Sequence, residues 1–149
     1  MTSRRDFMST VALVTAGVVG HISLPVLADD APVSPVDIGS IEQYKADGIV
    51  DTFVAKHRFF VVTHDKTIRA LSSRCTHKNK ALKSDGTQLR CPAHGSLFEL
   101  DGQMTKGPAK IGLPRSKITL DGDTLRVDPS VEFSHQAAAE PESFVKLAE

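Results

Sequence analysis

Two pairs of cysteine and histidine are the residues in this chain whose types and spacing could do chemistry. Cys75 and His77 form the first pair, and Cys91 and His94 form the second. The sequence has two cysteines and six histidines, so both of its cysteines lie in these pairs. Thiolate and imidazole are metal ligands of two chemical kinds. The four residues therefore predict a metal site with two sulfur and two nitrogen ligands.

The spacing alone does not settle which site these residues form, and three ordinary interpretations stay open. In an oxidising compartment, the two cysteines could form a disulfide. A mononuclear zinc site could use two cysteines and two histidines, although structural zinc sites usually open with a cysteine pair and close with a histidine pair. The histidines could also be ordinary surface residues. That last interpretation gives no reason for the sequences Gly95-Ser96 and Gly107-Pro108-Ala109 near the pairs.

These flanking residues make the region similar to the ligand signature of the Rieske iron-sulfur family. Gly95-Ser96 after His94 is similar to the family's His-Gly-Ser turn, and Gly107-Pro108-Ala109 is similar to its proline loop. The resemblance covers about residues 35 to 128 and implies one [2Fe-2S] cluster per chain. It further implies that one iron is held by two thiolates and the other by two imidazoles, and that Ser96, Gly107 and Pro108 border the cluster. The implied ligands are Cys75 and Cys91 for the first iron, and His77 and His94 for the second.

Three positions differ from the best-known members of the family. Lys80 and Ala93 stand where Rieske subunits of cytochrome bc complexes have two disulfide-bonded cysteines, and Phe98 stands where high-potential relatives have a tyrosine. Hydrogen bonds to the cluster sulfurs raise the reduction potential, and Ser96 can provide one of them. We therefore expect a potential between the low and high ends of the family range.

The elements that must position these residues are predicted to be β-strands. Short segments rich in β-branched and aromatic residues alternate with the turn sequences Asp85-Gly86, Asp101-Gly102 and Asp121-Gly122. This pattern favours an all-β fold, a small antiparallel sandwich or barrel. The resemblance implies that it is Rieske-like, with a cluster-binding tip formed by two loops. The predicted strands are Ile49 to Ala55, Arg58 to Thr63, Thr67 to Leu71, Gln88 to Arg90, Leu97 to Leu100, Lys117 to Leu120 and Thr124 to Val127.

The N-terminus has the pattern of an export signal. Arg4 and Arg5 form a twin-arginine sequence, and no formally charged residue follows from Phe7 to Ala28. Residues 1–28 are therefore expected to be a twin-arginine signal or a membrane anchor, with cleavage after Ala28 favoured. Export would place the protein in the periplasm or on the outer face of the cytoplasmic membrane.

The remaining chain is long enough for one domain with a modest core. We expect a linker at residues 29–35, the Rieske domain at residues 36–128 and a flexible C-terminal tail at residues 129–149. The full sequence has a formal net charge of 0, and this balance gives no sign of nucleic-acid binding.

The expected function is one-electron transfer and not stand-alone catalysis of a reaction on a substrate. Our main hypothesis is a periplasmic carrier, or a small subunit of an oxidoreductase, that exchanges electrons with a redox protein. The alternative is a membrane-anchored Rieske subunit of a cytochrome bc-type quinol oxidoreductase, with a quinol and a cytochrome as partners. The second alternative is a non-redox binding domain that holds zinc or a disulfide at the Cys-His positions.

Overall fold

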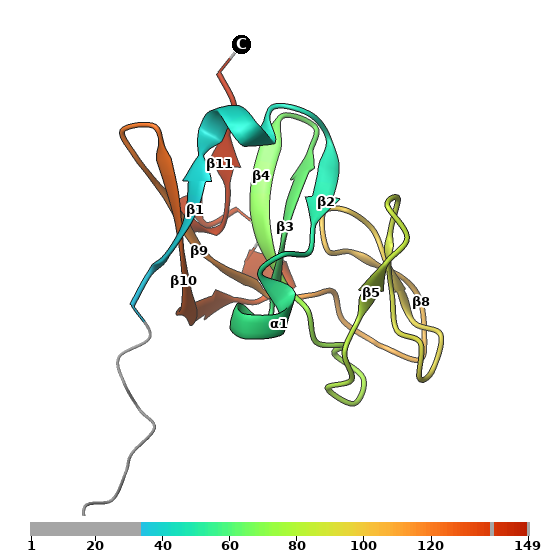
Figure 1. Ribbon diagram of the computed structural model, residues 1–149. Coiled ribbons are helices and arrows are strands. Elements are labelled where there is room, and N and C mark those ends of the chain that lie inside the picture. The colour runs from blue at the N-terminus through green and yellow to red at the C-terminus, as the bar shows by residue number, and fades with distance from the viewer. Residues whose placement is uncertain (1–33, 138, 149) are drawn as a thin grey trace, which may run out of the picture.

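Two antiparallel sheets make up the part of the chain described by the computed structural model, residues 34–137 and 139–148 (Figure 1). The large sheet has seven strands among these residues, and β11 pairs with β4 beside the main path. Its strands, in spatial order, are β1 (Val36–Ser40), β10 (Thr124–Phe133), β9 (Arg115–Asp121), β4 (Thr67–Ser72), β3 (Phe59–His64) and β2 (Gly48–Val50), with β11 at Val145–Lys146. The predicted all-β class is confirmed.

The small sheet lies wholly between β4 and β9 in the chain. Its four strands follow one another in sequence and in space. They are β5 (Lys83–Ser84), β6 (Leu89–Arg90), β7 (Leu97–Phe98) and β8 (Met104–Lys106). Figure 1 shows this sheet and its loops standing to one side of the large sheet. We call residues 73–113, which comprise the small sheet and its loops, the cluster unit.

Strand β3 separates two hydrophobic cores. Phe59 and Val61 point into the core inside the curled large sheet, whereas Phe60 and Val62 point into the core shared with the small sheet. Successive side chains of a strand point to opposite faces, so a strand buried on both faces needs a continuous apolar run. This explains why the sequence here does not alternate with polar residues.

The predicted strand from Ile49 to Ala55 is wrong over its second half. Strand β2 ends at Val50, and the chain then turns into the one-turn helix α1 (Val54–His57). The amide of Val54 donates to the carbonyl of Asp51, and Arg58 ends the helix with a φ of 63°. This hydrogen-bonded turn overrides the strand propensity of the segment. The other short helices in the described part of the chain are η1 (Ile41–Tyr44), η2 (His135–Ala137) and η3 (Pro141–Ser143).

The three Asp-Gly turns form as the sequence predicts, since Gly86, Gly102 and Gly122 all have positive φ values. Each supplies the backbone conformation that a tight connection between strands needs. The turn after Asp85 joins β5 to β6 and thereby positions the strand that leads directly into Cys91.

The C-terminal residues differ from the expected flexible tail. Strand β10 continues to Phe133, and β11 pairs with β4 through Val145 and Ile68. Ser143 is fully buried, and Glu142 forms an ion pair of 2.6 Å with Lys117. The expectation of a flexible tail rested on the alanine- and glutamate-rich composition. It did not take into account the apolar residues Val145 and Leu147, which pack against the core of the large sheet.

Candidate metal centre

Two loops with the same hydrogen-bond frame carry the Cys-His pairs. In the first loop, the Cys75 amide donates to the carbonyl of Lys80, and the Asn79 amide donates to the carbonyl of Cys75. In the second loop, the same two bonds join Cys91 with Ser96 and Gly95 with Cys91, and all four bonds are 2.8 Å long. Asn79 and Gly95 occupy equivalent positions and both have positive φ. The two loops thus have the same backbone hydrogen bonds, and each carries one Cys-His pair.

The two thiols lie in the core between the sheets. Cys75 is 2% exposed and Cys91 is 0% exposed, and both are free cysteines. They belong to the same buried cluster as Phe60, Leu89 and Phe98. Burial in apolar surroundings keeps water away from these sulfur atoms and disfavours the charged thiolates unless a cation accompanies them.

The histidines of the two loops lie beside each other and are less buried than the thiols. The ring centroids of His77 and His94 are 4.9 Å apart, and the rings are nearly perpendicular at 87°. The Nδ1 atom of His77 is buried and has no hydrogen-bond partner, whereas His94 is exposed. Loss of hydration, with smaller effects from His94 and Lys78, lowers the pKa of His77. A neutral ring with an unpartnered buried nitrogen is suited to metal ligation.

The spacing of these donors fits a two-iron cluster better than a single zinc ion. In a tetrahedral site with bonds of 2.0 to 2.3 Å, ligand atoms lie about 3.5 Å apart. Among the described residues, the group of three or more ligand-type side chains with mutual distances within 4.8 Å is Asp47, His64 and Asp65. No three of the four Cys-His residues form such a group. Two thiolates and two imidazoles divided between two irons do not require it.

A third segment, residues 107–111, is hydrogen-bonded to both loops. The buried hydroxyl of Ser96 accepts a bond of 3.0 Å from the Ala109 amide, which leaves its own proton free to be donated elsewhere. The hydroxyl of Thr76 donates a bond of 2.8 Å to the carbonyl of Ile111. We call these two hydrogen bonds the clasp. Gly107 and Pro108 are exposed beside it.

The positions that differ from the family pattern fall into two environments. Lys80 and Ala93 are exposed on the two loops, while Phe98 is fully buried. The sequence singled out Ser96 and Gly107-Pro108-Ala109 but missed Thr76. The missed contact joins residues 35 positions apart, and a single threonine gives no sequence signal of it.

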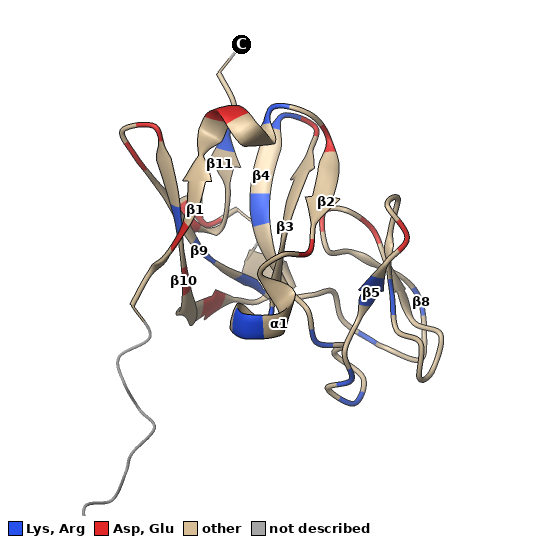
Figure 2. Ribbon diagram, in the orientation of Figure 1, with Lys and Arg blue, Asp and Glu red and all other residues tan. Residues whose placement is uncertain are grey.

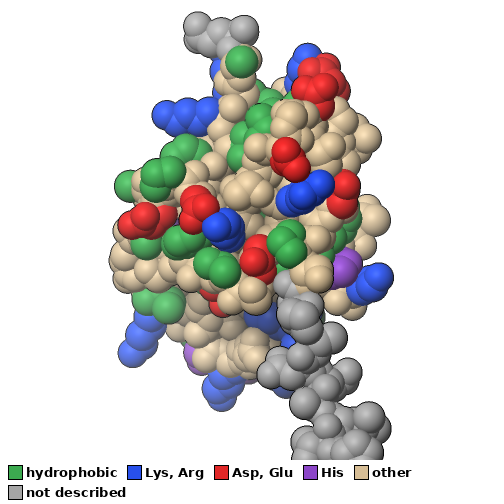
Figure 3. Space-filling view, turned by 90° about the vertical axis from the view of Figure 1, so that its left-hand side faces the viewer, with side chains coloured by type: hydrophobic (Ala, Val, Ile, Leu, Met, Phe, Trp, Pro, Cys, Tyr) green, Lys and Arg blue, Asp and Glu red, His purple; other side chains and the backbone are tan. Residues whose placement is uncertain are grey.

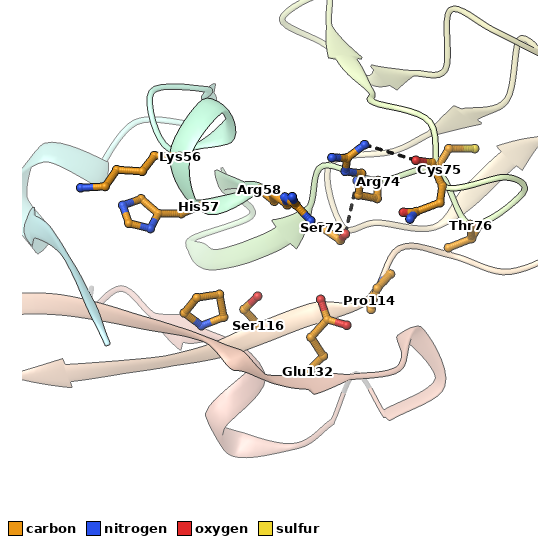
Figure 4. Close-up of a pocket in the computed structure, with 12 residues that line it drawn as sticks. Lys56, His57, Arg58, Ser72, Arg74, Cys75, Thr76, Pro114, Ser116 and Glu132 are labelled. Atoms are coloured by element: carbon orange, nitrogen blue, oxygen red, sulfur yellow. Dashed lines mark hydrogen bonds between the residues drawn. The ribbon is translucent and has the colours of Figure 1, made fainter. Parts of the chain in front are cut away.

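A cleft of about 640 Å³ opens beside the first loop, and sequence reasoning did not foresee it (Figure 4). Lys56 and Arg58 reach it from the end of α1, Glu132 from β10, and Arg74 from the first loop. The Arg74 guanidinium donates to the carbonyl of Asn79 at 3.3 Å, which braces the loop from this side. Only the folded chain brings these residues together, because they are distant in sequence.

The other histidines do not belong to the two loops, and His57 lines the cleft beside the first loop. His64 contacts Asp47 at 3.3 Å and Asp65 at 3.5 Å on the surface. His57 and His135 are half-buried, and His21 lies outside the described residues together with the predicted export signal. Within residues 34–137 and 139–148, no helix has the length and hydrophobicity to cross a membrane.

Comparison with known proteins gives a family match over residues 34–117 to the Rieske [2Fe-2S] domain. The iron-sulfur subunit of the cytochrome b6-f complex of Cyanothece sp. (strain PCC 7425 / ATCC 29141) is 25% identical over 162 residues, with 93% of this chain and 90% of that protein covered. The corresponding subunit of Synechococcus sp. (strain JA-3-3Ab) is 24% identical over 150 residues, with 85% and 87% covered.

A solved structure is also similar, that of the plasma membrane Rieske protein PetC3 from Synechocystis PCC 6803. It has a TM-score of 0.49 and 27% identity, and the match covers 62% of this chain and 98% of that chain. The family match over residues 34–117 takes in more than half of the sequence and all four Cys-His residues. The chain therefore belongs to the Rieske [2Fe-2S] domain family and is an electron-transfer protein with a [2Fe-2S] cluster.

Proposed function

We propose that this chain is the Rieske subunit of a membrane-bound quinol oxidoreductase of the cytochrome bc or b6-f type. The observation that carries the proposal is the similarity to cytochrome b6-f iron-sulfur subunits along 93% of this chain, which reaches into its uncharged N-terminal segment. In this proposal, that segment is exported by the twin-arginine route and retained as the membrane anchor. The membrane-bound subunit thus replaces the periplasmic carrier as our main hypothesis.

We assign the Cys-His pairs of the two loops as the cluster ligands. Cys75 and Cys91 hold the buried iron, and His77 and His94 hold the outer iron. The buried free thiols, the unpartnered Nδ1 of His77 and the shared frame of the loops support this assignment. When bound, the cluster accepts and releases one electron. The chain excludes water from the thiolates with Leu89 and Phe98, and it leaves His94 exposed toward a partner.

Ligation can be tested by iron and acid-labile sulfide analysis together with electron paramagnetic resonance of the reduced protein. We expect two irons and two sulfides per chain with a Rieske-type signal. Replacement of His94 by Cys should shift that signal toward an all-cysteine cluster, whereas His135→Ala should leave it unchanged. A mononuclear zinc protein would contradict the assignment.

The membrane assignment is tested by N-terminal sequencing of the native protein in membrane and soluble fractions. We expect an N-terminus at Met1 or Thr2 in the membrane fraction, and quinol-dependent cytochrome reduction in those membranes that is lost on deletion of the gene. A soluble protein starting at Asp29 would favour the other candidate, a periplasmic carrier. Lys80 and Ala93 are the observation on its side, because they replace the disulfide of cytochrome bc subunits.

A further inference from the structure

A row of basic side chains crosses the outer face of the small sheet. The strand register places Lys83 opposite Arg90, Arg90 opposite Leu97, and Leu97 opposite Lys106. The three cations are exposed and Leu97 is half-buried. The alternate residues Leu89 and Phe98, also paired with each other, are buried on the inner face. The row therefore belongs to the face that looks into solvent, and we call it the basic row.

The basic row has no structural explanation within the described residues. Like charges directly opposite each other on neighbouring strands destabilise a sheet, and Lys83 faces Arg90 in this way. None of the three cations makes an ion pair within residues 34–137 and 139–148. The acid on this face, Asp85, accepts hydrogen bonds from Thr87 and Gln88 in its own turn. An arrangement that costs stability points to a ligand outside the molecule.

Two shallow hollows flank Arg90 on this face, and Asp85 lines both of them. One has a volume of about 340 Å³ and reaches from Lys83 to Pro92. The other has a volume of about 290 Å³ and reaches from Gly95 and Leu97 to Lys106. Pro92 and Gly95 belong to the second ligand loop, and Arg90 directly precedes Cys91. A partner seated on the basic row would touch the loop that we assign to the cluster.

The charge of the whole cluster unit extends this local pattern. Residues 73–113 contain seven Lys and Arg against three Asp and Glu, a formal charge of +4, while the other described residues contain nine against eleven, a charge of −2. Figure 2 shows basic residues on β5 and on the loops near it. Figure 3 shows acidic and basic side chains intermingled on the side that carries β1 and β10. The positive charge is thus concentrated on the cluster unit.

We propose that the basic row and its two hollows dock an acidic redox protein, one with a patch of carboxylates around its own redox centre. The inference rests on the proposed electron-transfer function and names the chemistry of the partner. Carboxylate side chains of the partner pair with the exposed cations Lys83, Arg90 and Lys106. The reduced protein gives one electron to the oxidised partner, and no other bond or proton changes.

The test compares two electron acceptors of similar potential and opposite charge, an acidic blue copper protein and a basic c-type cytochrome. Stopped-flow kinetics of the reduced holoprotein give each rate constant as a function of salt. We expect the rate constant with the acidic acceptor to fall about tenfold or more between roughly 10 mM and 300 mM salt, since charge-steered association is screened by ions. The rate constant with the basic acceptor should rise or stay level.

The matched variants are Lys83→Gln with Lys106→Gln on the basic row, and Lys45→Gln with Lys146→Gln on the large sheet and its connections. Both pairs remove two positive charges. The first should slow the acidic acceptor about fivefold or more at low salt, and the second less than twofold. Equal slowing by both pairs would reduce the effect to net charge and overturn the docking site.

A parallel titration separates this proposal from the one on which it rests. Chemical-shift perturbation of the labelled blue copper protein measures binding without electron transfer, and the basic-row variant should weaken it while the control should not. Absence of the Rieske signal would defeat the proposed function, and the titration would still decide docking. Binding to anionic phospholipid vesicles, with no preference for the acidic acceptor, would assign the face to a membrane and contradict us.

Discussion

We propose that a hydroxyl hydrogen present at Ser96 and missing at Phe98 tunes the potential of the cluster. The Ser96 hydroxyl accepts from Ala109, so its proton is available to a cluster sulfur, while Phe98 has no hydroxyl to offer. Such bonds stabilise the extra negative charge of the reduced state. The predicted intermediate potential follows from one donor present and one missing.

Replacement of Ser96 by Ala should lower the midpoint potential, and replacement of Phe98 by Tyr should raise it. A difference of about 60 mV corresponds to roughly 1.4 kcal/mol for one electron, and we expect shifts of about that size. Protein-film voltammetry near neutral pH measures both. Shifts of the same sign in the two variants would indicate a general disturbance of the site and refute the hydrogen-bond explanation.

Asp85 ties the stability of the small sheet to pH. Hydrogen bonds from the Thr87 amide and the side chains of Gln88 and Thr87 lower its pKa from 3.8 to about 2. The folded state therefore binds the proton more weakly than the unfolded state. The resulting stabilisation is complete above pH about 4 and is lost as the pH falls through about 2.

The measurement is urea unfolding of the wild type and of Asp85→Asn at a series of pH values. The wild type should be the more stable protein at pH 6, and the difference should shrink below pH about 4. The comparison cancels effects that both proteins share, such as cluster loss in acid. A difference that does not depend on pH would show that the charge of Asp85 is not involved.

At the scale of elements, the two ligand loops depend on one left-handed residue each. Gly95 has a φ of 76°, and an added Cβ would meet no other atom within 4 Å, so backbone strain is the whole cost of a side chain there. Gly95→Ala should lower the melting temperature by about 4 °C, the equivalent of roughly 1 kcal/mol. Gly48 is an ideal control, because its surroundings are equally open and its φ is not positive. An equal loss in Gly48→Ala would contradict this reasoning.

The clasp should hold the cluster in place. Thr76→Val removes the bond to the Ile111 carbonyl and keeps the shape of the side chain, which costs about 1 kcal/mol, or roughly a fivefold faster loss of cluster. The decay of visible absorption at 37 °C measures this loss. Thr105→Val is the control, since Thr105 donates a long bond of 3.4 Å to Leu97 between β8 and β7 and does not contact residues 107–111 by it. An unchanged rate of decay in Thr76→Val would show that the bond from Thr76 to Ile111 does not help to hold the cluster.

The elements that the sequence predicts well are the ones with strong local signals. Strands β3 and β4 agree within a residue with the expected Arg58 to Thr63 and Thr67 to Leu71, because both are continuous segments of strand-forming residues. Strands β5 and β11 have two residues each and depend on pairing with a neighbouring strand, which a local sequence pattern does not reveal. Likewise, the Cys-His pairs were visible in the sequence, whereas the clasp and the cleft depend on contacts between distant segments.

At the scale of the whole molecule, strand β3 contributes to two cores that differ in how much they depend on the cluster. The core inside the large sheet contains Ile38, Ile118 and Val127 and does not include the cysteines, whereas the other core contains Cys75 and Cys91. Removal of the cluster should therefore loosen one side of the molecule more than the other.

Hydrogen exchange with mass spectrometry can compare the holoprotein with protein from which iron has been chelated. Amides of β6 and β7 should exchange about tenfold faster after removal of the cluster, because their two-residue strands have few other supports. Amides of β3, β4 and β9 should change little. A uniform increase along the chain would mean that the fold is a single cooperative unit.

The pairing of β4 with β9, through Ala70 with Ser116, brings the two ends of the cluster unit together. Without residues 73–113, these strands would be neighbours that a short turn could join. The redox half of the protein is in this sense a graft on a β-hairpin, a segment that enters and leaves its host at one place. A transplant into another sheet would also have to bring part of β3 and β4, since Phe60, Val62 and Leu71 of these strands are three of the ten buried residues in the core that holds the thiols.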